Sequence, residues 1–204
     1  MSKWKGKGVK ILLFSANPAG TGALKLDEEV REIRKRVQAA AHRDLIRVEF
    51  APAARPSDLL EEMNRHEPHV VQFSGHGSEQ AGILVCDDRG NAKAVGGEAL
   101  ASLFESTEVN VQVVVLNACY SQAQAEAVAR VVPCVIGMKD AIGDKAARIF
   151  ASAFYGALGF GRSVEVAFRQ GLTALRLEGI SQSDLPDLIT RSGFKASEIA
   201  PVNP

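Results

Sequence analysis

The chain has 204 residues, in which 24 Lys and Arg balance 24 Asp and Glu, and 46% of its residues are apolar. This length fits one compact domain with or without a small appendage, and the apolar share is sufficient to fill one large core. A formal net charge of zero argues against a protein whose main task is to coat nucleic acid or an anionic membrane. It leaves open a local charged pocket.

The three cysteines, Cys86, Cys119 and Cys134, are an odd number without paired spacing, so they do not indicate a disulfide framework. The chain contains neither C-x-x-C nor H-E-x-x-H, and no metal site is predicted. Its basic start is followed by a short apolar stretch, ILLF, which is too short for a signal peptide or a membrane span. We therefore expect a soluble, reduced, cytoplasmic protein with no cofactor and no direct contact with membrane or nucleic acid.

Short β-branched runs alternate with stretches of helical period along the chain. The expected strands are residues 9–14, 45–50, 69–73, 111–116 and 134–137, and residues 83–86 and 93–95 form a small hairpin or flap. The expected helices are residues 26–40, 56–64, 97–104, 121–131, 147–158 and 164–175. This alternation predicts an α/β sandwich of three layers around a mostly parallel sheet.

The last part of the chain differs in composition from the rest. Residues 181–204 are polar and interrupted by prolines. We expect residues 1–180 to form the domain and residues 181–204 to form a loosely docked C-terminal tail.

The candidate catalytic residues follow the third and fourth expected strands of the parallel sheet. His76 lies in the sequence SGHG and Cys119 in the sequence NACY, and such strand ends are where α/β sheets place their chemistry. A cysteine nucleophile needs a nearby base, and histidine suits that role near neutral pH. The backbone N–H groups of Gly77 and Cys119 are then candidate donors to an oxyanion.

The remaining cysteines and histidines are expected to be structural. Cys86 and Cys134 lie inside apolar strand runs and predict core positions. His66 and His69 are separated by a helix-breaking proline, and His42 has no partner in the pattern, so none of the three is predicted to bind a metal. Cys119 itself has the competing interpretation of a small hydrophobic residue at a strand end.

Four phrases of the sequence resemble one family. VVQFSGHG and VVVLNACYSQ resemble the two active-site strands of caspase-like cysteine peptidases. The phrases KILLFSANPAGTGALKLDEEVREI and IFASAFYGALGFGRSVEVAF are similar to the CHAT domain branch, which is related to caspases and separase. The resemblance extends from Val9 to Leu175 and implies a caspase-like fold and a peptidase with a His76/Cys119 dyad.

The resemblance also implies where the first specificity pocket lies. Asn117, two residues before the candidate nucleophile, would line one wall, and the loop at residues 137–140 would line the other. An acidic residue in this loop selects a basic side chain in separase-like enzymes, and Asp140 falls at the similar place. Caspases that select Asp use an arginine in the loop after the first strand, and the corresponding loop here, residues 15–22, contains no arginine. We therefore expect cleavage after Arg or Lys, unless Asp140 or Asp144 merely caps the following helix.

Regulation and partners follow from the same resemblance. Only residues 120–133 separate the candidate nucleophile from the next strand, so there is no processing linker of the caspase kind. We expect an upstream activating protease or a sensor protein to switch on the cleavage of a protein substrate in a bacterial antiviral defence or signalling cascade. Residues 87–93 and the segment near Arg191 are candidate regulatory or cleavable sites.

Two other readings of the sequence stay open. The chain could be a catalytically silent caspase-like interaction module, although the complete His76/Cys119 pair argues against it. It could also be a Rossmann-like nucleotide binder, because the loop SANPAGTG contains glycines, but it lacks both G-x-G-x-x-G and the Walker pattern.

Overall fold

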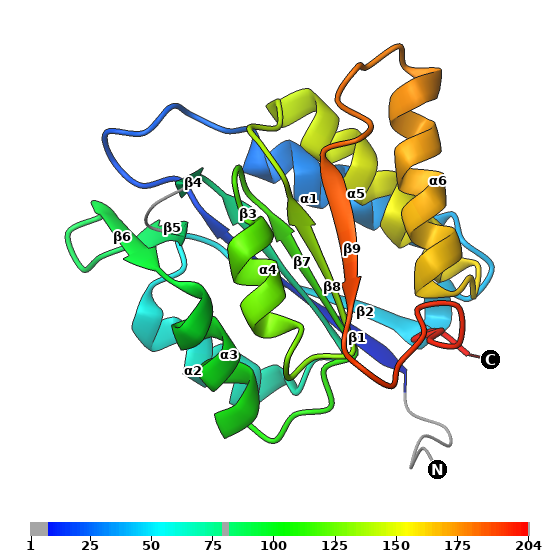
Figure 1. Cartoon of the computed structure of the whole chain (residues 1–204), viewed down its shortest axis with the longest axis horizontal. Helices are drawn as coiled ribbons and strands as arrows, with labels where there is room; N and C mark the ends of the chain where they lie inside the picture. The colour runs from blue at the N-terminus through cyan, green and yellow to red at the C-terminus, as the bar shows by residue number, and fades with distance from the viewer. Residues whose placement is uncertain (1–7, 79–81, 204) are drawn as a thin grey trace.

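The structure, a computed structural model, describes residues 8–78 and 82–203. Its centre is a six-stranded sheet in the order β2-β1-β3-β7-β8-β9 (Figure 1). The first five of these strands are parallel, and β9 runs antiparallel to β8. The strands are β1 (Val9–Ala16), β2 (Ile46–Ala51), β3 (Val70–Gly75), β7 (Val113–Asn117), β8 (Cys134–Met138) and β9 (Pro186–Thr190).

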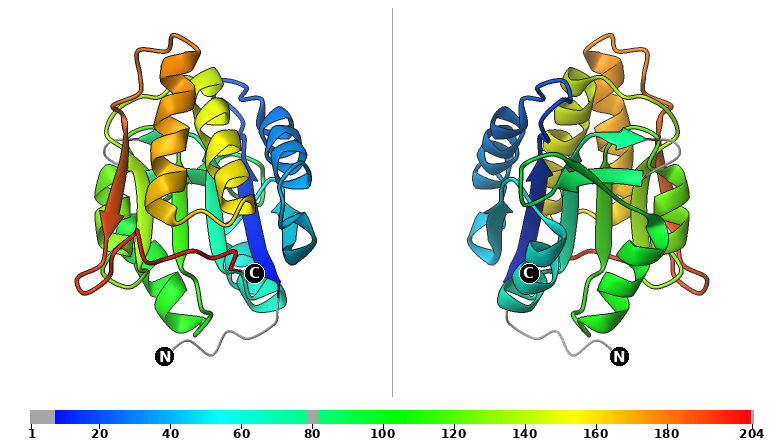
Figure 2. Two further views of the ribbon diagram at one scale, coloured as in Figure 1. Left: turned by 90° about the vertical axis from the view of Figure 1, so that its right-hand side faces the viewer. Right: turned by 90° about the vertical axis from the view of Figure 1, so that its left-hand side faces the viewer.

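Helices cover both faces of this sheet (Figure 2). One face packs against α1 (Leu26–Gln38), α5 (Asp144–Gly159) and α6 (Val164–Leu177). The other packs against α2 (Pro56–His66), α3 (Gly97–Ser106) and α4 (Gln122–Val128). The expected three-layer α/β sandwich is therefore confirmed. None of the helices in the described ranges is long and apolar enough to cross a membrane.

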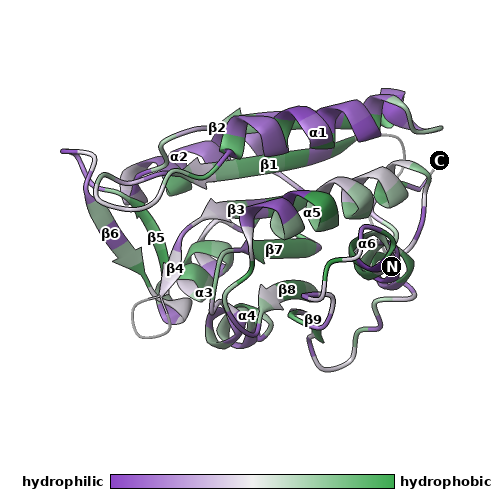
Figure 3. Cartoon of the chain, turned by 90° about the horizontal axis from the view of Figure 1, so that it is seen from above, coloured by the Kyte–Doolittle hydropathy of each residue, from purple (hydrophilic) through white to green (hydrophobic). Residues whose placement is uncertain are grey.

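The sequences of the central strands are apolar without interruption because these strands are buried on both faces. All five residues of β7 are buried. Val113 and Val115 face the core under α1, α5 and α6, whereas Val114 and Leu116 face the core under α2, α3 and α4. A strand covered on both faces needs apolar residues at every position rather than at alternate ones. Figure 3 shows most of β7 coloured as hydrophobic, whereas α1, at the surface of the molecule, is largely hydrophilic.

A second, three-stranded antiparallel sheet projects beyond the end of β3. It consists of β4 (Gly77–Ser78), β5 (Gly82–Cys86) and β6 (Ala92–Val95), so the expected hairpin is confirmed. The turn between β5 and β6 is held by Asp87, whose Oδ1 accepts the N–H groups of Arg89 at 2.8 Å and of Asn91 at 2.7 Å. The N–H of Ala19 donates to the carbonyl of Gly90 at 2.8 Å, which ties this turn to the loop after β1.

The prediction of a loosely docked tail after residue 180 is wrong. β9 pairs with β8 along its whole length, and the side chains of Ala196 and Val202 are buried in the core under α5 and α6. The polar sequence misled because β9 is an edge strand with only one protein neighbour, so most of its residues are only half-buried. The C-terminal segment is part of the same folded unit.

Removal of residues 181–204 is expected to lower the melting temperature by about 10 °C or more, or to prevent soluble expression. The truncation uncovers the edge of β8 and the core surface beneath Val202, which is 1% exposed in the full chain. Circular dichroism melts of the two proteins provide the measurement. Identical melting curves would contradict the incorporation of this segment into the fold.

Candidate active site

His76 and Cys119 lie at the same edge of the central sheet. β3 and β7 are neighbours, with Ser74 opposite Asn117 in register, and each candidate catalytic residue follows two positions later. We call the edge where β1, β3, β7 and β8 end the carboxyl edge (Figure 1). The expected adjacency of the two strands is thus confirmed, and it places His76 and Cys119 on adjoining segments.

The backbones of these two segments touch at Gly77. A Cβ atom at Gly77 would lie 2.0 Å from the carbonyl oxygen of Cys119 and 3.2 Å from its nitrogen. Only glycine fits such a close approach of two backbones. It brings together the two residues whose N–H groups are the candidate donors to an oxyanion.

The ring of His76 is oriented by the loop that follows β1. Its Nε2 lies 2.6 Å from the carbonyl oxygen of Gly22. A carbonyl can only accept a hydrogen bond, so in the neutral ring Nε2 carries the hydrogen and Nδ1 keeps the lone pair of a base. The loop is itself held by Asn17, which both donates to the carbonyl of Leu24 at 2.9 Å and accepts its N–H at 3.2 Å.

The thiol of Cys119 is half-buried against the loop between β8 and α5. Its Sγ donates to the carbonyl of Ile142 at 3.6 Å. The N–H of the next residue, Tyr120, donates to the carbonyl of Asp140 at 3.4 Å. The expected specificity loop therefore lies beside the candidate nucleophile.

The other two cysteines are core residues, as expected. Cys86 and Cys134 are 6% and 0% exposed. Burial raises the pKa of Cys134 to about 12, so that its sulfur stays a neutral thiol at physiological pH. Cys119 is the most accessible of the three thiols.

The two residues expected to line the specificity pocket differ in their surroundings. Asp140 is exposed, and its Oδ1 accepts the N–H of Ala141 at 2.6 Å. Asn117 is only 4% exposed, and its Nδ2 donates inward to Oε1 of Glu29 at 2.8 Å. Asp144 accepts the N–H of Lys25 at 3.1 Å, an interaction with the loop before α1.

Glu29 was not singled out by the sequence, yet it lies directly beneath this site. It is 4% exposed, and besides Asn117 its carboxylate accepts hydrogen bonds from Gln72 and Ser74 of β3. A signal was present: Glu29 lies three residues after Leu26 and four before Ile33, on the buried stripe of α1. Burial raises the pKa of Glu29 to about 7, so the fold loses stability as the pH rises from about 4.5 to about 7.

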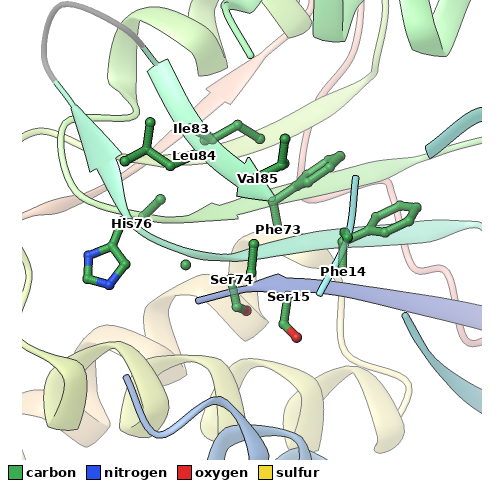
Figure 4. A pocket seen from close by; sticks show the side chains of 12 residues that line it. Phe14, Ser15, Phe73, Ser74, His76, Ile83, Leu84 and Val85 are labelled. Carbon is green, nitrogen blue, oxygen red and sulfur yellow. The ribbon is translucent and has the colours of Figure 1, made fainter. Parts of the chain in front are cut away.

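An apolar pocket lies beside His76 on the opposite face of the sheet from Glu29 (Figure 4). It lies between the central sheet and β5, and its cavity volume is about 10 Å³, the space of about one water molecule. The stacked rings of Phe14 and Phe73, 5.1 Å apart, form one wall, and Ile83 and Val85 form the other. A cavity of this size is too small to hold a substrate side chain.

The candidate regulatory segments are both ordered in the structure. The turn within residues 87–93 is closed by the Asp87 contacts described above. The backbone N–H of Arg191 donates to the carbonyl of Pro133 at 3.0 Å, and its guanidinium donates to the carbonyl of Val131 at 3.1 Å. Cleavage at either place would require local unfolding first.

The fold has a counterpart among solved structures. The crystal structure of caspase-1 from Spodoptera frugiperda matches with a TM-score of 0.58 and 10% sequence identity, covering 90% of this chain and 86% of that one. At this identity the match shows the fold alone. The molecule is a caspase-like α/β protein with a histidine and a cysteine at the carboxyl edge of its sheet.

The family model of the CHAT domain matches residues 2–186, and the chain belongs to the CHAT domain family. A "Roc-COR-CHAT protease" from an unknown prokaryotic organism is 25% identical over 174 residues, which are 82% of this chain and 16% of that protein. A "Probable protease" of Gillisia limnaea is 22% identical over 182 residues, 87% of this chain and 32% of that protein. The chain thus spans a third or less of the length of these relatives.

Proposed function

We propose that the chain is a cysteine endopeptidase in which Cys119 attacks a peptide carbonyl and His76 takes up the thiol proton. The observation that carries this proposal is the placement of both residues on adjoining strand ends, with Nε2 of His76 bonded to Gly22 and Nδ1 left as the base. The names of the longer relatives and the caspase-like fold support a peptidase.

The proposed hydrolysis needs only the thiol of Cys119, the imidazole of His76, two backbone N–H groups and water. The Cys119 sulfur bonds to the carbonyl carbon, and the oxygen that becomes negative receives hydrogen bonds from the N–H groups of Gly77 and Cys119. Protonated His76 then gives its proton to the leaving amine as the C–N bond breaks. Water, deprotonated by the same imidazole, hydrolyses the thioester and restores the free thiol.

The experiment that tests this function is a cleavage profile. Purified protein is incubated with a proteome digest, and new amino termini are identified by mass spectrometry with Cys119→Ala as the control. New termini that require Cys119 are expected. A profile that is the same for both proteins would contradict the peptidase function.

The substrate class that we propose is a protein cut after Arg or Lys. The supporting observation is the exposed carboxylate of Asp140 in the loop that contacts Cys119 and Tyr120. A carboxylate at this place can form a bidentate pair with a guanidinium. Asn117 would line the opposite wall from the end of β7, although its amide nitrogen faces Glu29.

Asp140→Asn is expected to raise KM for peptides with Arg at the cleaved position by about tenfold or more, with a smaller effect on peptides with Leu. Steady-state kinetics with a panel of peptides that differ at this one position provide the measurement. Asp44→Asn, whose carboxylate is 88% exposed in the short helix before β2, is the matched control. A wild-type preference for Leu or Asp would contradict the proposed specificity.

We also propose that a partner controls this activity within a reduced cytoplasm, in a bacterial defence or signalling cascade. Three free thiols and the length of the relatives support this setting. Only residues 118–133 connect β7 to β8, so activation by cleavage of a long linker has no counterpart here. Peptide turnover that no upstream protease or sensor protein increases would contradict control by a partner.

A further inference from the structure

One buried carboxylate connects the ends of the two strands that carry the candidate dyad. Ser74 and Asn117 face each other in register, and each lies two residues before His76 or Cys119. Both donate to the same atom, Oε1 of Glu29, at 3.0 Å and 2.8 Å. A single acceptor on α1 thus fixes the last paired residues of β3 and β7.

Glu29 is held in place from both sides along its helix. The guanidinium of Arg148 on α5 is only partly exposed and contacts Glu28 at 2.6 Å, Glu32 at 3.3 Å and Asp144 at 3.1 Å. Glu28 and Glu32 flank Glu29 on α1, so this ion-pair cluster fixes the turn that carries the buried carboxylate. The position of Glu29 relative to the sheet is therefore tied to that of α5.

The carboxylate of Glu29 is the principal hydrogen-bond acceptor for the side-chain donors of Ser74 and Asn117. Oε1 of Gln72, Oδ1 of Asn117 and the hydroxyl of Tyr155 are buried without a hydrogen-bond partner in the described structure. Apart from Glu29, Nδ2 of Asn117 reaches only the carbonyl of Ala147, at 3.4 Å. Removing the carboxylate would leave buried donors at both strand ends poorly satisfied, which costs more than an ordinary hydrogen bond.

We propose that Glu29 is a positioning residue, which fixes the ends of β3 and β7 and thereby the spacing of His76 and Cys119. The role rests on the proposed peptidase function. Glu29 touches neither dyad residue in its hydrogen bonding and acts through Ser74 and Asn117. A displacement of about 1 Å between reacting groups costs roughly 100-fold in rate, so a brace at this place has a large effect.

The positioning of the two strand ends by Glu29 depends on its charge. An ionised carboxylate accepts all the hydrogen bonds that β3 and β7 offer, whereas a protonated carboxyl accepts more weakly and must itself donate. The titratable groups that face it are Asp144 and Tyr155 on α5, and the neutral side chains facing it are Gln72, Ser74 and Asn117. Burial raises its pKa to about 7, so the change falls in the range where the enzyme would operate.

The test uses alkylation of Cys119 by iodoacetamide, which needs no substrate or activator. Rates are measured by mass spectrometry from about pH 5.5 to about pH 8.5 for the wild type, Glu29→Ala, Glu29→Gln and the control Asp27→Asn, an exposed carboxylate on the same helix. Glu29→Ala is expected to lower the Cys119 rate roughly tenfold at pH 8, and Glu29→Gln, which keeps one acceptor oxygen but no charge, to restore only part of it. Asp27→Asn is expected to match the wild type.

The buried thiols Cys86 and Cys134 report the integrity of the fold in the same samples. If the alkylation rate of Cys119 changes only in variants in which Cys86 and Cys134 are also labelled faster, Glu29 stabilises the fold and does not position the dyad. That result would overturn the proposal. If Glu29→Ala does not fold, the ratio of the Cys119 alkylation rates of the wild type and Glu29→Gln is compared across the pH range. The ratio is expected to change near pH 7, and a ratio that stays constant with pH overturns the proposal.

A further arm separates this proposal from the peptidase function. In a His76→Ala background, Glu29→Ala is expected to have no additional effect, because it acts through the dyad. Should His76→Ala itself leave Cys119 labelling unchanged, the dyad would fail. An unchanged rate in Glu29→Ala beside a lowered rate in His76→Ala would overturn only the positioning role.

Discussion

Cys119→Ala is expected to abolish peptide hydrolysis, and His76→Ala to lower kcat/KM by about 10²- to 10⁴-fold. The alanine at position 119 removes the only atom that can form the thioester. The alanine at position 76 leaves a thiol without a base, because the carbonyl of Ile142, to which Sγ donates, cannot take up its proton. Steady-state turnover of a peptide found in the cleavage profile provides the measurement.

The matched control is Cys86→Ala, which removes a buried sulfur on β5 that has no place in the reaction. It is expected to retain turnover within about twofold, at a modest cost in stability. Wild-type turnover by Cys119→Ala would overturn the peptidase function. Equal alkylation of all three cysteines, unaffected by His76→Ala, would favour a catalytically silent interaction module instead.

Gly77→Ala is expected to reduce turnover by about 100-fold or more and to destabilise the fold by about 1–3 kcal/mol. The added methyl group would overlap the carbonyl oxygen of Cys119, at a distance of 2.0 Å, so one of the two backbones must move. Either movement displaces an N–H group from the candidate oxyanion position and changes the spacing of the dyad.

Gly96→Ala is the control for this substitution, since a Cβ at Gly96 would have no neighbour within 4 Å. Its turnover is expected to equal that of the wild type. Kinetics and thermal melts of the two variants provide the measurement. A Gly77→Ala protein as active as the wild type would contradict the close packing of the two backbones at the site.

The sequence predicted the strands at the centre of the sheet and the edge where the candidate dyad lies. This succeeded because Val113–Leu116 is buried on both faces, which only apolar residues tolerate, and because parallel strands end at a common edge. The expected core positions of Cys86 and Cys134 followed from the same logic.

What the sequence did not predict depends on contacts between distant segments. The strand Pro186–Thr190 is short, with Leu188 and Ile189 as its two large apolar residues, and it forms because β8 offers it an open edge. The bond between His76 and the carbonyl of Gly22 involves a backbone atom, which leaves no trace in the residue types. Glu29 lies in an acidic first turn of the kind that many surface helices have. Only its position on the buried face of α1 distinguishes it from Glu28.

The antiparallel direction of β9 decides where additional domains could join this one. β1 begins, and β9 ends, at the edge of the sheet opposite the candidate active site (Figure 2). A protein module or label fused at either end would therefore start on the far side of the molecule and leave the approach to Cys119 open. In a longer protein, such a module would adjoin the start of β1 or the segment after β9 rather than the carboxyl edge.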